Sequence, residues 1–290
     1  MSTARPGGRR LPSGSWLLLV PALALVTAIL VVPLGQSLLL SVASPEWGVG
    51  NYTRLFSDGV TMTVLARTAR TAAVVTLVAF ALGYPYAYLL TRVGPRARAL
   101  LLVVVLIPFW TSVMARNFAW LLILQRGGPV QKVAAALGGE DIAFVGTTLG
   151  VTIAMSQVLL PFMVLPLYSS LSGIDRKLLL AARGLGSSPL AAFWKIYWPL
   201  SRGGVVAGLI FVFTLSLGFY VTPALLGSPQ QSLVAQLLAQ RTTQLLDFAG
   251  AGALGMLGLA ATLVLVAWAN RLGGTISAIG VVATSGTKDR

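Results

Sequence analysis

The sequence contains neither cysteine nor histidine. Their absence excludes thiolate and imidazole metal sites, catalysis by a Cys or His nucleophile, and any disulfide framework. Charged residues are scarce too, at 10% of the 290 residues, whereas a soluble globular chain carries about 25%. Hydrophobic residues make up 56% of the chain. This composition indicates a membrane protein, for which we expect no metal and no other cofactor.

Long apolar runs organise the chain. A bilayer core about 30 Å thick requires about 20 apolar residues in a helix, and six runs meet or approach that length. The first run exceeds the apolar core of a signal peptide, which has about 7–15 residues, so we expect it to be retained. The pattern predicts an all-α polytopic membrane protein with six transmembrane helices, at 16–41, 68–90, 99–124, 148–171, 205–226 and 249–271.

The net charge of +14 does not indicate nucleic-acid binding, because the basic residues lie in short loops between the apolar runs. Fourteen of the 21 Lys and Arg residues fall on one side of the predicted membrane, and seven fall on the other. Since basic loops stay in the cytoplasm, both termini and the loop 173–204 are expected to be cytoplasmic. The predicted organisation is therefore a tail at 1–15, a transmembrane domain at 16–271 that includes this loop, and a tail at 272–290.

The loop 173–204 is the longest on the cytoplasmic side, and it is not composed like a linker. Asp175 is expected to cap a short helix that runs through Ala182, and Gly184 and Gly186 follow as a stop. Ser188 and the proline after it then predict the start of a second helix, which runs toward Pro199. Such an amphipathic helical pair suits docking into a groove of a partner protein, or lying on anionic lipid. The residue pattern alone leaves both interpretations open.

The loop resembles the EAA loop of permeases from binding-protein-dependent ABC importers, which engages the ATPase subunit. That pattern is a Glu-Ala-Ala triplet, a glycine four residues later, and an Ile-x-Leu-Pro ending. The matching positions are Ala181, Ala182, Gly186, Ile196 and Pro199. Leu180 replaces the glutamate and Trp198 replaces the leucine, so any ion pair made by the glutamate is in doubt. The resemblance implies an ATPase-coupling set of Leu180, Ala181, Ala182, Gly186, Phe193, Ile196 and Pro199.

Three further segments, 108–112, 160–168 and 220–227, resemble the first permease of spermidine/putrescine importers. The resemblance implies a type I ABC importer permease of the bacterial inner membrane that works by alternating access, with a polyamine as the leading solute and other small organic solutes open. It also implies three protein partners: a dimer of ATP-binding subunits, a second permease that is a paralogue, and a periplasmic or extracellular solute-binding protein. The chain lacks a Gly-x-x-x-x-Gly-Lys-Ser/Thr phosphate loop, so ATP hydrolysis is expected on a separate subunit and no enzymatic activity is expected here.

One ionisable residue, Arg116, lies clearly inside a predicted span, and such residues are functional candidates. Three interpretations are open: its side chain extends outward to the membrane surface, it pairs with Glu140, Asp141 or Asp247, or it lines the solute pathway. An unpaired arginine would repel a polyamine, so passage would then depend on aromatic faces or on carboxylates of a second permease. The candidate pathway residues are Phe109, Trp110, Arg116, Phe219 and Tyr220, although the aromatic residues also suit ordinary helix packing.

Two other classes of protein remain as alternatives. A self-sufficient secondary transporter or channel usually carries intramembrane carboxylates or inverted repeats, and the sequence shows neither. An integral membrane enzyme would need clustered catalytic groups, which the absence of His and Cys disfavours.

Overall fold

The computed structural model describes residues 15–44, 46–136, 138 and 143–284, and these residues contain helices and no strand. Five helices are long and apolar enough to cross a membrane. They are α1 (Ser15–Ala43), α3 (Gly59–Arg92), α7 (Thr148–Ser172), α13 (Phe248–Thr284) and the continuous helical stretch from Pro189 to Leu217, which ends with α10 (Trp198–Leu217). A sixth crossing is formed if the bent pair α4 (Pro95–Trp110) and α5 (Val113–Leu124) counts as one span.

The predicted third span at 99–124 is not one straight helix. The chain bends by 102° between α4 and the segment that begins with α5. Thr111 and Ser112 adopt extended backbone angles there, which interrupts the helical hydrogen bonds. The predicted fifth span is divided as well, because α10 ends at Leu217 and a separate helix α11 (Val221–Leu226) follows. Both interruptions lie beside the same cavity, described below.

The core forms where α7 packs between α3 and α10. Met163 of α7 is fully buried, and glycines on both neighbouring helices make room for it. A Cβ at Gly83 of α3 would lie 2.8 Å from Met163 Cγ, and a Cβ at Gly208 of α10 would lie 2.7 Å from its Sδ. Small residues at such contacts let membrane helices approach closely. These three helices therefore form a tight frame for the rest of the bundle.

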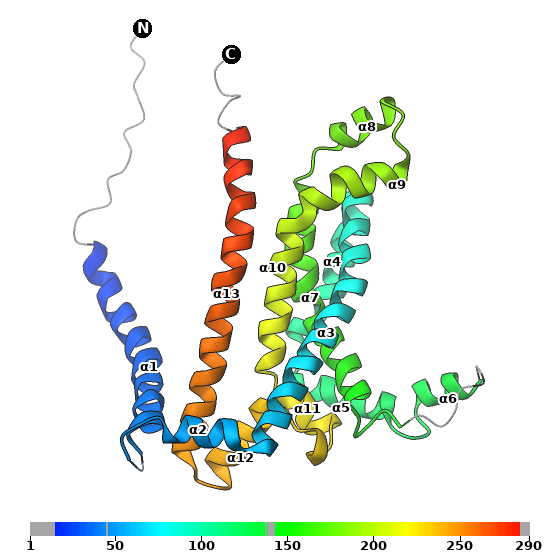
Figure 1. The fold of residues 1–290 in the computed structure, drawn as a ribbon. Coiled ribbons are helices and arrows are strands. Elements are labelled where there is room, and N and C mark those ends of the chain that lie inside the picture. The colour runs from blue at the N-terminus through cyan, green and yellow to red at the C-terminus, as the bar shows by residue number, and fades with distance from the viewer. Residues whose placement is uncertain (1–14, 45, 137, 139–142, 285–290) are drawn as a thin grey trace.

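The first and last spans form a second pair, α1 with α13, which continues to Thr284 beyond the predicted end of the sixth span at Arg271. The short helices α2 (Gly50–Ser57) and α12 (Val234–Thr243) connect this pair to α3 at one end of the molecule (Figure 1). Leucine, valine and isoleucine side chains of α1 are widely exposed, as expected of a surface that faces lipid.

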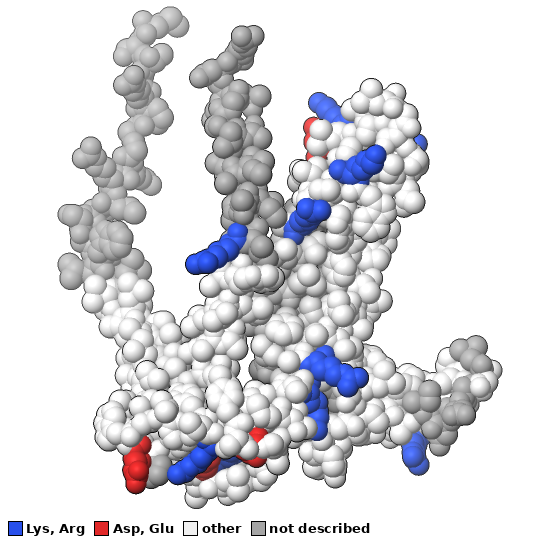
Figure 2. Space-filling model, viewed as in Figure 1, with Lys and Arg blue, Asp and Glu red and all other residues white. Residues whose placement is uncertain are grey.

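The two ends of the bundle differ in structure. The short helices α8 (Arg176–Gly184) and α9 (Pro189–Ala192) lie at one end, and α2, α11 and α12 lie at the other, with α6 (Pro129–Ala136) projecting to the side (Figure 1). On the face shown in Figure 2, charged side chains lie in an upper and a lower zone, and a band without charged side chains separates the two zones. Such a band suits the hydrocarbon core of a membrane.

Candidate functional site

The loop between α7 and α10 folds into a capped helical elbow, which we call the α8–α9 elbow (173–199). Asp175 Oδ1 accepts a hydrogen bond of 2.8 Å from the Lys177 backbone N–H and so caps α8. The helix ends in a Schellman motif at Gly186, which has a φ of +84°. Its two bonds run from Gly186 N–H to Arg183 O and from Ser187 N–H to Ala182 O, both 3.0 Å. The predicted glycine stop is thus present, with Gly186 in the left-handed position.

The second half of the elbow differs from the predicted helix in how it ends. Ser188 Oγ caps α9 by accepting a bond from Ala191 N–H, as predicted. A π-helical turn, η1 (Phe193–Tyr197), then leads directly into α10, so Pro199 does not end the helix. Proline has no N–H to donate to the carbonyl four residues earlier, and the wider turn, with Trp198 N–H bonded to Phe193 O, accommodates that loss. The elbow is therefore continuous with α10, without an intervening loop.

The elbow presents apolar side chains to its surroundings. Leu185 is 88% exposed, and Leu180, at the position of the family's glutamate, is 66% exposed. Beside them lies a cavity of about 370 Å³ whose walls include Leu179, Leu180 and Arg183. Exposed leucines around a basic cavity at the end of a membrane bundle are suited to contact with a partner protein.

The coupling residues expected from the sequence divide into two groups. Leu180 and Ala181 are exposed, and Gly186 shapes the turn, so these three lie on the outer side of the elbow. Phe193, Ile196 and Pro199 are half-buried on its inner side. The sequence indicated one functional patch, whereas the structure divides these residues between an exposed outer surface and an inner side that packs on the helix bundle. Ala182 is half-buried and lies between the two groups.

An aromatic cluster, which sequence reasoning missed, attaches the elbow to α3. Phe193 meets Tyr84 and Tyr88 edge-on, with ring centroids 6.2 and 6.0 Å apart, and stacks on Tyr197. The hydroxyl of Tyr197 is 3.2 Å from Thr91 Oγ1. The signal was the four-residue spacing of Tyr84 and Tyr88, matched by the spacing of Phe193 and Tyr197, which places each pair on one helix face.

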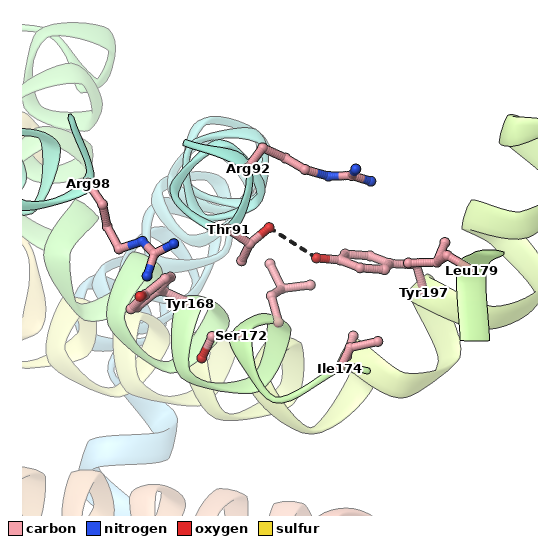
Figure 3. A pocket seen from close by; sticks show the side chains of 9 residues that line it. Thr91, Arg92, Arg98, Tyr168, Ser172, Ile174, Leu179 and Tyr197 are labelled. Atoms are coloured by element: carbon pink, nitrogen blue, oxygen red, sulfur yellow. Dashed lines mark hydrogen bonds between the residues drawn. The ribbon is translucent and has the colours of Figure 1, made fainter. Parts of the chain in front are cut away.

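A small cavity of about 110 Å³ lies beneath the elbow, between the ends of α3 and α7 (Figure 3). Arg98 lines it and donates to Leu90 O and Val93 O, at 3.0 and 3.2 Å, which satisfies carbonyls at the end of α3. The hydroxyl of Tyr197 reaches Thr91 across the same space. These contacts fix the base on which the elbow rests.

A larger cavity, of about 460 Å³, lies beside the two broken spans. It is lined by four of the five predicted pathway residues and by their neighbours in both breaks: Phe109, Arg116, Phe219 and Tyr220, with Thr111 and Gly218. Trp110 is not part of the lining, and its side chain is 79% exposed. The helix breaks thus bring together residues that are more than one hundred positions apart in sequence.

Arg116 bridges the break between α4 and α5. Its Nη1 donates to Pro108 O, a carbonyl that loses its helical partner because the chain is extended at residues 111 and 112. Its Nε is buried and has no hydrogen-bond partner among the residues that the structure describes. Of the predicted acidic partners, Asp247 pairs with Arg241 instead, and Glu140 and Asp141 lie outside the described residues.

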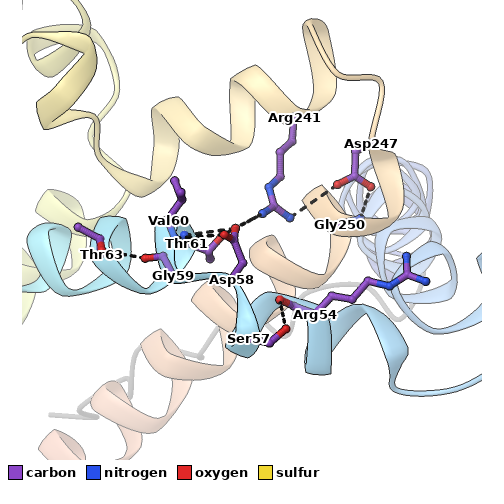
Figure 4. Close-up of polar contacts among 10 residues, drawn as sticks. All are labelled: Arg54, Ser57, Asp58, Gly59, Val60, Thr61, Thr63, Arg241, Asp247 and Gly250. Carbon is purple, nitrogen blue, oxygen red and sulfur yellow. Dashed lines mark hydrogen bonds and ion pairs between the residues drawn. The ribbon is translucent and has the colours of Figure 1, made fainter.

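A cluster of charges at the opposite end of the bundle, which sequence reasoning also missed, centres on Arg241 of α12 (Figure 4). Its guanidinium is 3.3 Å from Asp58 at the start of α3 and 3.6 Å from Asp247 at the start of α13. The pKa of Asp58 is lowered, chiefly by the hydrogen bond from the Thr61 hydroxyl. The backbone N–H groups of Val60 and Thr61 and the Arg241 charge lower it further, whereas burial opposes the shift. No sequence motif indicated this cluster, because Asp58 lies 183 positions before Arg241 in the chain.

Comparison with known proteins gives a family for the chain. Residues 76–274 match the family described as binding-protein-dependent transport system inner membrane component. The spermidine/putrescine transport system permease protein PotB of Escherichia coli K12 is 34% identical over 77% of this chain and 82% of its own length. PotB of Haemophilus influenzae is 31% identical over 77% of this chain and 80% of its own length.

The fold also matches a solved structure. A chain from the crystal structure of a bacterial ABC transporter involved in the import of the acidic polysaccharide alginate superimposes with a TM-score of 0.75. The match covers 90% of this chain and 95% of that chain at 16% sequence identity, so it bears on the fold alone.

Proposed function

Because the chain belongs to the family of binding-protein-dependent transport system inner membrane components, we propose that it forms half of a membrane pathway for a polyamine of the spermidine or putrescine type. As a member of this family it is a multi-pass inner-membrane permease subunit of an ABC importer, without enzymatic activity. It works with a separate ATPase and a solute-binding protein. The alternative of a self-sufficient transporter is set aside on that ground.

The observation that carries the polyamine assignment is the 34% identity to PotB over 77% of the chain. The test is to reconstitute the complete importer in liposomes and measure ATP-driven uptake of radiolabelled spermidine and putrescine. Calorimetry on the purified solute-binding protein gives an independent reading. Saturable uptake and binding of a polyamine support the assignment, whereas a binding protein that ignores polyamines and takes another solute refutes it.

The cavity between the two broken spans is the proposed solute pathway. Discontinuous membrane helices expose backbone and polar side chains at mid-membrane, which is where transporters bind their solutes. Thr111 and Gly218 lie at the two breaks, and the rings of Phe109, Phe219 and Tyr220 surround the space. Aromatic faces of this kind attract ammonium groups by about 0.5–2 kcal/mol each. Alternating access of this cavity to the two sides would move the solute.

The α8–α9 elbow is the proposed contact with the ATPase dimer. Its support is the exposed leucine surface at one end of the bundle, its rigid capping and its direct continuation into α10. A nucleotide-driven movement of the ATPase would thus reach α10 through the π-helical turn and α3 through the aromatic cluster. This assignment places the elbow, both chain termini and the tails 1–15 and 272–290 in the cytoplasm, as the distribution of basic residues predicts.

We also propose that a second permease, a paralogue of this chain, completes the pathway. The exposed side chains beside the cavity, Trp110 and Met114 among them, form an apolar rim that a second subunit would cover. Purifying the assembled importer and identifying its permease chains by mass spectrometry tests this composition. Finding this chain alone, in two copies, would contradict it.

A further inference from the structure

Arg116 is a half-buried cation whose hydrogen bonding is incomplete. Nη1 is held by Pro108 O, and Nε is shielded from solvent without a partner in the described part of the chain. The side chain lies within the bent pair that counts as a span, on the wall of the 460 Å³ cavity. An arginine within a membrane span is costly, by up to about 2.5–3.5 kcal/mol at the centre of a helix on insertion scales, so a counter-charge is expected nearby.

The chain itself offers few candidates for that counter-charge. Its seven acidic residues include none in the five candidate spans. Asp58 and Asp247 are engaged by Arg241, and Asp175 caps α8 at the other end of the bundle. Glu46 lies between α1 and α2, and the remaining three, Glu140, Asp141 and Asp289, fall outside the described residues. The cavity wall formed by the described residues therefore carries a positive charge and no carboxylate.

We infer that the second permease presents a membrane-embedded carboxylate to Arg116 across the shared cavity. The inference rests on the proposed function, because a cavity whose charged lining, among the described residues, is a single arginine would repel a polyamine. Two copies of this chain would bring two Arg116 side chains to one cavity without a carboxylate from any candidate span. Charge complementarity thus requires a different chain, one that carries an Asp or Glu within a transmembrane helix where this chain has none.

The surroundings of Arg116 are suited to such a contact. Exposed apolar side chains border it on α4 and α5, including Phe109, Val113 and Met114. An apolar rim around a single charged centre excludes water and strengthens a buried ion pair. The pair would neutralise Arg116 between transport events, and the aromatic faces of the cavity would remain free for ammonium groups of the solute.

Charge reversal in the complete importer tests the inference. Arg116→Glu should lower ATP-driven polyamine uptake by about tenfold or more, because it places two carboxylates together. Replacing each membrane-embedded Asp or Glu of the second permease by Arg, one at a time, should restore uptake with Arg116→Glu at one position only. Arg116→Lys should retain most of the uptake. Arg70→Gln, at an exposed arginine of α3 that does not line the cavity, is the matched control and should leave uptake unchanged.

A physical readout accompanies the uptake assay. Because the chain has no cysteine, Arg116→Cys introduces a single thiol, which should form a disulfide with a cysteine placed at the rescuing position of the second permease. Rescue together with this cross-link supports the inference. It is overturned if no position rescues or if the second permease has no membrane-embedded acid. The neutral variant Arg116→Gln tests for a partner within this chain. The inference is also overturned if neutralising Glu140 and Asp141 together (Glu140→Gln with Asp141→Asn) lowers uptake as much as Arg116→Gln does.

The outcomes separate this inference from the proposed function. If the binding protein takes a polyamine and no partner acid rescues Arg116→Glu, the inference fails and the polyamine assignment stands. If the binding protein takes an anionic solute and rescue is still seen, the polyamine assignment fails and the ion pair stands. If it takes an anionic solute and no rescue is seen, both fail, and Arg116 contacts the solute itself.

Discussion

The Arg241 Nη2 atom lies 3.3 Å from Asp58 Oδ2, which ties α12 to the first turn of α3 across 183 positions of sequence. The same guanidinium contacts the Thr61 hydroxyl at 2.8 Å and Asp247 at 3.6 Å. The side chain of Arg241 is only 14% exposed, so the cluster is shielded from solvent on the arginine side. It therefore joins the α1–α13 pair to the central bundle at the end opposite the α8–α9 elbow.

Replacing Arg241 by Gln should destabilise the protein. The substitution leaves two carboxylates without their shared cation, which costs about 0.5–1 kcal/mol, because Asp58 and Asp247 are 37% and 44% exposed and water screens the loss. Thermal unfolding of the purified chain in detergent should show a lowered midpoint. Arg54→Gln is the matched control, since Arg54 is an exposed arginine of α2 at the same end of the bundle, and it should change the unfolding midpoint little. An equal effect of both variants would show that the cluster is not a specific tie.

The contribution of Asp58 should depend on pH. Its pKa is lowered below the ordinary value of 3.8 by the Thr61 hydroxyl bond, the backbone N–H bonds and the Arg241 charge, with burial opposing them. A carboxyl whose folded pKa is depressed stabilises the fold above its unfolded pKa and loses that stabilisation as the pH falls through the folded value. The advantage of wild type over Asp58→Asn should therefore be full at neutral pH and disappear below about pH 4. Asparagine still caps a helix, so the comparison isolates the charge. An advantage that does not vary with pH would contradict the assignment.

Much of the architecture could be predicted from the sequence, because membrane helices are specified by the length and apolarity of their runs. The all-α polytopic fold and the ABC permease family are confirmed. The capping of α8 by Asp175 and the turn at Gly186 were also predictable, since N-caps and C-terminal glycines are local signals.

The breaks in the third and fifth spans could not be predicted from hydropathy. The two apolar runs are long enough to be interpreted as single spans, and hydropathy does not show that the chain bends at Thr111 or that α10 ends at Leu217. At the first break Arg116 donates to Pro108 O, a contact that hydropathy does not indicate. The Arg241 cluster escaped prediction for a similar reason, because a single sequence gives no indication of which distant charges meet. The π-helical turn before Pro199 shows that a proline need not end a membrane helix when a wider turn removes the need for its N–H.

Replacing Gly186 by Val should uncouple transport from ATP hydrolysis. The residue has a φ of +84°, where a side chain costs about 1–2 kcal/mol and a β-branched one more. The Schellman bonds that set the angle between α8 and α9 should be lost, while the spans still insert. Uptake and ATPase activity of the reconstituted importer should show hydrolysis continuing with uptake reduced about tenfold or more.

The control for this variant is Gly184→Ala. Gly184 is the last residue of α8, its φ is not positive, and a Cβ there would meet open space. It should therefore preserve coupling. Normal uptake by the Gly186→Val importer would remove the elbow from the coupling mechanism.

Leu180→Glu restores the residue expected at this position of the EAA loop, and it should be tolerated or should strengthen association with the ATPase. Leu180 is 66% exposed and lines the cavity that also contains Arg92 and Arg183. A glutamate there would lie among basic side chains and would cost little to expose. Co-purification of the ATPase with the permease over a series of salt concentrations measures the change, and Leu180→Gln serves as the uncharged control. The prediction is contradicted if the glutamate variant fails to assemble while the glutamine variant assembles normally. That result would mean that the ATPase surface in contact with residue 180 accommodates an uncharged side chain and excludes a negative charge.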